Sequence, residues 1–408
     1  MHISTAAILA ALALASASEA AITVPGANGS DGILNVTSNI SIDLSQAPNG
    51  AWDSTSPTPG KGVYDGDKGA VVFHYSSVSM TAGSIVFKNH PSRASVVWLV
   101  NGDVTINGIV SLDGASSGGV SPAPEPGPGG FAGGKPALTT GIYAGGEGPG
   151  WGLGGGAKGP QNGAGYAGPG LSGTFPGVAY GTAQVVPLIG GSGGGGSNGV
   201  GGGAGGGAIL IAATGTITIN GSIRANGGNG GNYGGAGNQS GSGSGGAIRL
   251  VADTVAGTGT INTLGGTVYA GAPGRIRIEA NTRASTLTVN PLPSAALPSN
   301  PALIWPDTSA PSVRIVSVGS NAVPAQPLGE LNQAADVLPD ILPASFPVVV
   351  ETKNVATTAQ VNLRVAPLIG DAVTVPCAFV SGTSTLATWT ASVNLTSGST
   401  SLQVRIEP

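Results

Sequence analysis

Hydrophobic and polar positions alternate in short segments along the first 290 residues. Val104-Thr105-Ile106 has this pattern, and Ile217-Thr218-Ile219 repeats it further along the chain. A period of two places every second side chain on the same face of a β-strand, so both segments are predicted to be strands with one apolar face. An Asn-Gly pair follows each of them and predicts a tight turn.

These segments belong to an internal repeat. Residues 102–110 recur as residues 215–223, and the apolar strand before the second copy covers residues 209–211. That apolar strand returns at residues 248–250 and 276–278, at distances of 39 and 28 residues. Since a short strand–turn unit cannot bury its own apolar face, its copies are expected to stack on one another.

Stacked copies of this kind predict an all-β fold, an irregular parallel β-helix or β-solenoid over residues 21–290. Residues 21–60 are the candidate cap at its N-terminal end. The large gap between the first two copies contains a glycine-rich insert, residues 115–207, which is expected to project from one coil. The insert forms either ordered glycine helices or a flexible lobe.

The pattern changes near Pro291. Six prolines between residues 291 and 311 predict a stiff, extended linker. Residues 312–408 contain about seven short strand-like runs separated by turns, which favours an immunoglobulin-like β-sandwich. The paired cysteines of antibody domains are missing, because Cys377 is the one cysteine of the chain.

The N-terminus has the pattern of a secretory signal. Residues 6–15 are apolar, and small residues at 15–20 fit a cleavage site after Ala20. We therefore predict a signal peptide at residues 1–20 and a secreted, extracellular or cell-surface location. The remaining chain contains no apolar run long enough to predict a membrane span.

Glycine supplies 73 of the 408 residues, whereas the chain has only 15 Lys or Arg and 19 Asp or Glu. Soluble domains average about 7% glycine and about 25% charged residues. This composition excludes helical and coiled-coil proteins, and the net charge of −4 lacks the basic footprint of nucleic-acid binding. Of the 73 glycines, 59 lie within residues 101–280, so the high glycine content belongs to this segment and not to the whole chain.

Candidate ligand-facing side chains come from the repeat. If the copies stack in register, Trp98, Leu210, Arg249 and Arg277 form one outward-facing column. The functional interpretation is a stripe that binds an acidic sugar or surface polymer. The structural interpretation is a solvated face in which Arg249 and Arg277 blunt the edge of the terminal coil.

Aromatic residues of the insert are a second set of candidates. They either stack on sugar rings or plug the insert onto the solenoid. Trp151, Tyr143 and Tyr166 are the candidate ligand-facing residues, and Phe175 and Tyr180 lie in the same segment.

No constellation of catalytic residues stands out, so we assign no catalytic residue, metal site or cofactor. Hydrolysis of a glycosidic bond requires paired carboxylates, and the repeats supply few. Asp65 and Asp67 form the tightest acidic pair, which is either a surface turn or a weak Ca²⁺ contact. The chain has no Cys/His cluster that would predict zinc.

Several of these segments together resemble a group of secreted, glycine-rich β-helix proteins of bacterial exoproteomes. The resemblance covers roughly residues 70–280 and implies the fold and export more than an activity. The segments that carry it are residues 207–213, 218–221, 243–252 and 274–280.

These observations favour an extracellular structural or adhesive surface protein without enzymatic activity. Its expected partner is an extracellular polysaccharide or a cell surface, with no nucleic acid. A polysaccharide-active β-helix enzyme is the alternative, and a self-assembling extracellular filament subunit, joined by solenoid ends or donated strands, is a further one.

Overall fold

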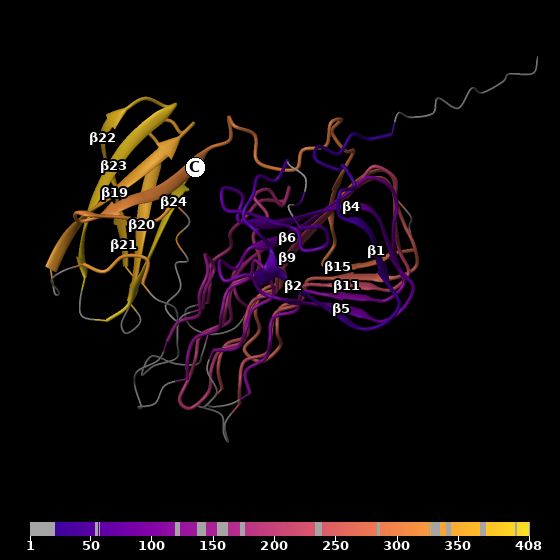
Figure 1. The fold of residues 1–408 in the computed structure, drawn as a ribbon. Coiled ribbons are helices and arrows are strands. Elements are labelled where there is room, and N and C mark those ends of the chain that lie inside the picture. The colour runs from indigo at the N-terminus through magenta and orange to yellow at the C-terminus, as the bar shows by residue number, and fades with distance from the viewer. Residues whose placement is uncertain are drawn as a thin grey trace, which may run out of the picture.

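The computed structural model consists of β-strands in two parts, a stack of largely parallel strands and a C-terminal pair of antiparallel sheets (Figure 1). The only helical element in the described residues is a 3₁₀ turn at Leu44–Gln46, so the predicted all-β class is confirmed. The predicted signal peptide, residues 1–20, lies outside the described residues. The structure describes residues 21–53, 56, 58–118, 123–136, 144–152, 162–171, 176–232, 239–283, 286–325, 327, 335–339, 344–367, 373–395 and 398–407.

The parallel stack contains two sheets. The larger sheet has ten strands, and its long path runs in the order β10-β7-β4-β6-β9-β12-β14-β16, with β1 and β3 also paired to β4. Only β3 is antiparallel to its neighbour. The strands are β1 (Gly32–Val36), β3 (Val63–Asp65), β4 (Ala70–Met80), β6 (Ser95–Val100), β7 (Val104–Ile106), β9 (Ala208–Ala213), β10 (Thr216–Ile219), β12 (Ala247–Ala256), β14 (Arg275–Arg283) and β16 (Ser294–Ala296).

The smaller sheet of the stack has six parallel strands in the order β15-β13-β11-β8-β5-β2. Its inward side chains and those of the larger sheet form one apolar core. The strands are β2 (Ile40–Asp43), β5 (Ser84–Lys88), β8 (Ile109–Ser111), β11 (Ser222–Arg224), β13 (Thr260–Asn262) and β15 (Thr288–Asn290).

Strand pairing confirms the internal repeat. Ile217 lies beside Val104, as the two similar segments predict. Ile248 lies between Ile209 and Ile276, its counterparts in the neighbouring copies. Side chains at the corners follow the same spacing, because Asn220 Nδ2 donates a hydrogen bond of 3.0 Å to Asn107. Copies that are similar in sequence are therefore neighbours in space.

The predicted outward column is wrong at Trp98. The register places Trp98 beside Ile211, whereas Val97 lies beside Leu210. A shift of one residue moves a side chain to the other face of a sheet, so Trp98 points into the core. The sequence does not indicate which residues of β6 point into the core, because all six are buried and both faces of the strand are apolar.

The outer face of the larger sheet is covered by two segments from distant parts of the chain. Ile22 and Val24 pack there beside Ala302 and Ile304, over apolar side chains of β6, β9 and β12. The Ala302 amide donates a hydrogen bond of 2.8 Å to the Thr23 carbonyl. The segment predicted as a linker, residues 291–311, therefore also supplies strand β16 and a cover for the stack.

Glycine-rich runs pack beside the parallel strands and appear in Figure 1 as ribbon without arrows. Run 201–207 donates backbone hydrogen bonds in three directions, and every third residue donates to the same neighbouring run. A repeat of three without internal bonds is the geometry of an extended threefold helix. The donor and acceptor pairs are Gly202 and Gly205 with Gly134 and Phe131, Gly203 and Gly206 with Gly241 and Ser244, and Ala204 and Gly207 with Ala115 and Leu112.

These runs come from three successive copies of the repeat. The described residues of segments 112–207, 225–246 and 263–274, here called the glycine lobe, connect β8 to β9, β11 to β12 and β13 to β14. The expected single insert at 115–207 is therefore only the longest of three excursions that share one bundle. The insert was expected to form either ordered glycine helices or a flexible lobe. Its described residues include a glycine helix, run 201–207, which is bonded to neighbouring runs.

Backbone packs directly against backbone inside the glycine lobe. A Cβ atom added to Gly203 would overlap the carbonyl oxygen of Gly228, and one added to Gly206 would overlap that of Ala225. The helices can approach this closely only because these positions have no side chain. The high glycine content is thus a packing requirement of this lobe.

The C-terminal part contains two antiparallel sheets with strand orders β18-β17-β19-β23-β22 and β21-β20-β24. The sheets share an apolar core around Val350, Leu363 and Trp389, with Cys377 buried at its border. The strands are β17 (Ser312–Val318), β18 (Asn321–Ala322), β19 (Ala344–Lys353), β20 (Gln360–Pro367), β21 (Val373–Pro376), β22 (Ala378–Gly382), β23 (Leu386–Leu395) and β24 (Thr400–Glu407).

The packing of the glycine lobe predicts the effect of added methyl groups. We expect Gly203→Ala to lower the unfolding free energy by about 3 kcal/mol or more, because rigid backbone must move to admit the Cβ. Gly168→Ala is the matched control, since no atom lies within 4 Å of its added Cβ, and its change should stay within about 1 kcal/mol. Urea unfolding followed by circular dichroism measures both, and equal shifts would contradict the backbone-contact argument.

Candidate functional site

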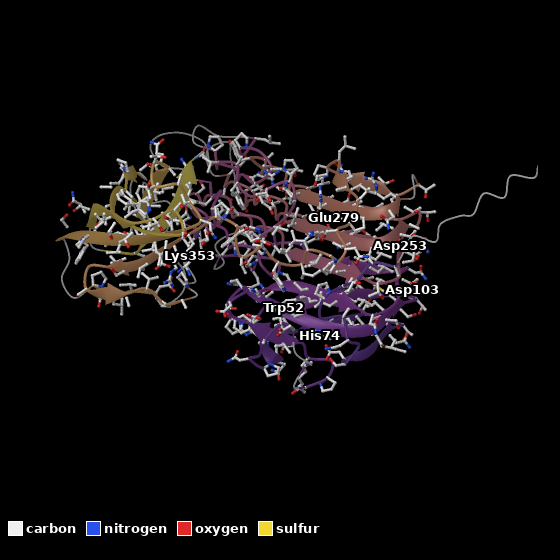
Figure 2. All side chains as sticks on the ribbon, turned by 90° about the horizontal axis from the view of Figure 1, so that it is seen from above. Trp52, His74, Asp103, Asp253, Glu279 and Lys353 are labelled. Atoms are coloured by element: carbon white, nitrogen blue, oxygen red, sulfur yellow. The ribbon has the colours of Figure 1, made fainter. Side chains whose placement is uncertain are left out.

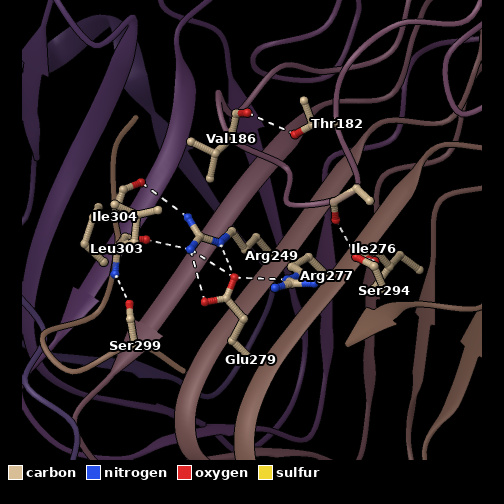
Figure 3. A network of polar contacts seen from close by, with 11 residues as sticks. Thr182, Val186, Arg249, Ile276, Arg277, Glu279, Ser294, Ser299, Leu303 and Ile304 are labelled. Carbon is tan, nitrogen blue, oxygen red and sulfur yellow. Dashed lines mark hydrogen bonds and ion pairs between the residues drawn. The ribbon is translucent and has the colours of Figure 1, made fainter. Parts of the chain in front are cut away.

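Arg249 is buried under the cover of the larger sheet, with 2% of its surface exposed. Its Nε donates to Glu279 Oε1 at 3.1 Å, and its Nη2 donates to Oε2 at 3.3 Å (Figure 3). Burial lowers the pKa of the Arg249 guanidinium, and the Glu279 carboxylate opposes that shift. Arg249 is therefore neither ligand-facing nor solvated, and both expectations from the sequence are wrong for this residue.

The same guanidinium holds the covering segment in place. Nη2 of Arg249 donates to the Leu303 carbonyl at 2.5 Å, and Nη1 donates to the Ile304 carbonyl at 3.4 Å. Arg277, which remains partly exposed, donates from Nε to Glu279 Oε1 at 3.1 Å. A buried ion pair with such additional partners fixes geometry, because each charge would be costly to bury alone.

Trp98 is also not ligand-facing, contrary to the prediction from the sequence. Its side chain is fully buried in the core of the parallel stack, where the ring packs edge-on against Tyr75 at a centroid distance of 5.9 Å. Its role in this structure is to fill the core.

Tyr166 is buried between the glycine lobe and the larger sheet. Its hydroxyl donates to the Ile189 carbonyl at 2.6 Å, and its ring stacks on Tyr180 at 4.4 Å. Burial raises the pKa of both tyrosines above the ordinary value of 10.0. These contacts favour the structural interpretation, in which aromatic residues plug the insert onto the stack.

Trp151 joins the glycine lobe to the C-terminal sheets. It is buried, and the Arg364 guanidinium lies 4.2 Å from the centre of its ring. Nε2 of Gln403 donates to the Gly148 carbonyl at 3.0 Å nearby. Two effects lower the pKa of Arg364 to about 10: desolvation of its guanidinium is the larger, and repulsion by the charge of Arg405 is the smaller. Tyr143 and Phe175 lie outside the described residues.

The candidate site is formed by two tryptophans that the sequence did not single out. Trp52 and Trp305 are half-buried, whereas the other three of the five tryptophans are buried. Their ring centroids lie 5.7 Å apart in an edge-to-face arrangement, and Lys68 Nζ lies 6.0 Å from the Trp305 ring. We call Trp52, Trp305 and Lys68 the tryptophan corner. Figure 2 shows Trp52 on the N-terminal side of the stack.

Each member of the tryptophan corner is held through its backbone or its neighbour in sequence. Asp65 accepts from the Trp52 amide at 2.9 Å with one oxygen and from the Lys68 amide at 3.1 Å with the other. Asp65 thus orders a turn, as the structural interpretation of the Asp65 and Asp67 pair expects. Trp305 directly follows Ile304, whose carbonyl Arg249 binds.

The tryptophan corner offers a ring surface and a cation at one place. Indole rings have apolar faces that stack on flat, partly apolar surfaces, including the C–H faces of sugar rings. An ammonium group beside them favours anionic substituents. Trp52 and Trp305 were missed because they are far apart in the sequence and belong to no repeat. The available signal was the position of two rare aromatic residues outside predicted strands.

Within the described residues, no three His, Cys, Asp or Glu side chains are grouped so that they could hold a metal ion, and no helix is long and apolar enough to cross a membrane. Comparisons with protein-family models, curated proteins and solved structures gave no significant match. The resemblance to secreted glycine-rich β-helix proteins therefore stays a prediction.

The buried ion pair predicts a large effect of removing one charge. We expect Glu279→Gln to lower the unfolding free energy of the parallel stack by about 3 kcal/mol or more, because Arg249 would stay buried without its carboxylate. The same substitution at Glu351, which pairs with the exposed Arg314, should cost below about 1 kcal/mol. Denaturant unfolding of both variants tests this, and a small effect of Glu279→Gln would show that Arg249 finds other partners.

Proposed function

We propose that this protein is an extracellular structural or adhesive surface protein, without enzymatic activity, that binds polysaccharide at the tryptophan corner. The observation that carries the proposal is the half-buried pair Trp52 and Trp305 beside Lys68. The extracellular location rests on the signal peptide predicted at residues 1–20.

The finer fold assignments belong to the same proposal. We propose an irregular β-solenoid for the parallel stack, supported by parallel pairing of successive copies of the repeat. We propose an immunoglobulin-like arrangement for the C-terminal sheets, supported by their antiparallel strands and shared core. In this view the solenoid is a rigid stalk and the C-terminal sandwich is a docking module.

Rigidity of the binding surface supports an adhesive role. Trp305 lies on a segment whose carbonyls are bound by a buried guanidinium, and the Trp52 amide is bound by a carboxylate. Side chains that are already ordered lose little conformational entropy on binding. The tryptophan corner is thus suited to capture repeating sugar units that a polymer presents many times.

Binding to polysaccharides tests the proposed function. We expect Trp52→Ala and Trp305→Ala each to weaken binding at least about tenfold, because each removes a stacking surface. Trp305→Tyr should retain most of the affinity. Lys68→Ala should weaken binding of an acidic polyuronate more than binding of a neutral glucan. Isothermal titration calorimetry with both polymers measures these effects.

The controls separate the tryptophan corner from other surfaces. Leu297→Ala removes an exposed apolar side chain from the same segment and should leave affinity unchanged. Binding that survives both tryptophan substitutions, or binding to neither polymer, would contradict the proposed site. Release of reducing sugars from either polymer would instead favour the alternative, a polysaccharide-active enzyme.

A further inference from the structure

Strand β22 is an exposed edge of the larger C-terminal sheet. All five of its residues are exposed, and among the described strands it pairs only with β23 (Figure 1). An edge strand presents unpaired amide and carbonyl groups along one side, so it can accept a further strand. The edge of the smaller sheet, β21, immediately precedes it in the chain.

Apolar side chains lie along this edge. Phe379 and Val380 have 44% and 55% of their surface exposed, and a β-bulge separates Phe379 from Ser381 in the pairing with β23. The Phe379 ring packs edge-on against Trp389 at 5.4 Å, so the edge is continuous with the sandwich core. Val373 and Leu386 are also about half exposed. The core of the sandwich is thus incompletely covered at β21 and β22.

The edge also lacks the charges that usually keep strand edges apart. Residues 372–404 contain no Asp, Glu, Lys or Arg, and this stretch includes β22 and β23 entirely. Charged residues on an edge strand prevent its pairing with another chain. Strand β22 carries no such charge.

We propose that β22 pairs antiparallel with β22 of a second copy of this chain. A neutral edge meets itself without like-charge repulsion, and an antiparallel strand pair satisfies twofold symmetry with the same residues on both sides. Phe379 and Val380 of each copy are covered in this dimer. The two five-stranded sheets become one continuous sheet across the twofold axis. This inference is independent of polysaccharide binding.

Analytical ultracentrifugation of the chain from residue 21 onward, over a range of concentrations, tests the dimer. We expect a reversible dimer of the unaltered chain. Val380→Lys should raise the dissociation constant at least about 100-fold, because two ammonium groups would meet across the axis. Leu297→Lys is the matched control, since Leu297 is 73% exposed in the stack, and it should leave the dimer intact.

A cross-link distinguishes this interface from others. Val380→Cys should form an intermolecular disulfide under mild oxidation, whereas Leu297→Cys should not. A monomer at every concentration, or a dimer that Val380→Lys leaves unchanged, would overturn the proposal. Circular dichroism of each variant verifies that the sandwich is folded, so that loss of the dimer reports on the edge.

Discussion

Packing of backbone directly against backbone is the constraint on which the rest of this structure depends. In the glycine lobe, helices from three copies of the repeat approach so closely that a Cβ at Gly203 or Gly206 would overlap a neighbouring carbonyl. Run 201–207 donates its backbone hydrogen bonds to neighbouring runs and none within itself. The excursions therefore hold one another, and the parallel strands from which they leave stay in register. Most glycines of the lobe do not have a left-handed backbone, so backbone conformation does not explain why glycine is needed there. The requirement is close approach between neighbouring backbones.

A second interaction connects this framework to the candidate site. Arg249 lies beside Leu210 and Arg277 on the outer face of the stack, where a charge would ordinarily be solvated. The covering segment buries it, and Glu279 and two carbonyls then satisfy its guanidinium. The ion pair fixes the path of the chain just before Trp305. Arg249, which the sequence suggests as a ligand-facing residue, thus positions the half-buried Trp305.

Much of the strand order could be predicted from the sequence, and the phase of individual strands could not. The recurrence of Thr-Ile-Asn-Gly identified neighbouring copies, because similar strands stack on one another. The face on which Trp98 lies could not be predicted, because β6 is apolar on both faces and its sequence does not show which side chains point into the core. The tryptophan corner could not be predicted, since Trp52 and Trp305 meet only when a distant segment folds back over the sheet.

The sequence by itself determined an all-β chain, its repeating strands and the location of its glycine excess. These follow from local pattern, namely a period of two, turn residues and composition. Only the tertiary structure decided which surfaces are buried. It showed that residues 291–311 cover the stack, that Arg249 is internal, and that glycine runs from three copies form one lobe. The reason is physical, since burial depends on contacts between segments far apart in the chain, and no local pattern encodes them.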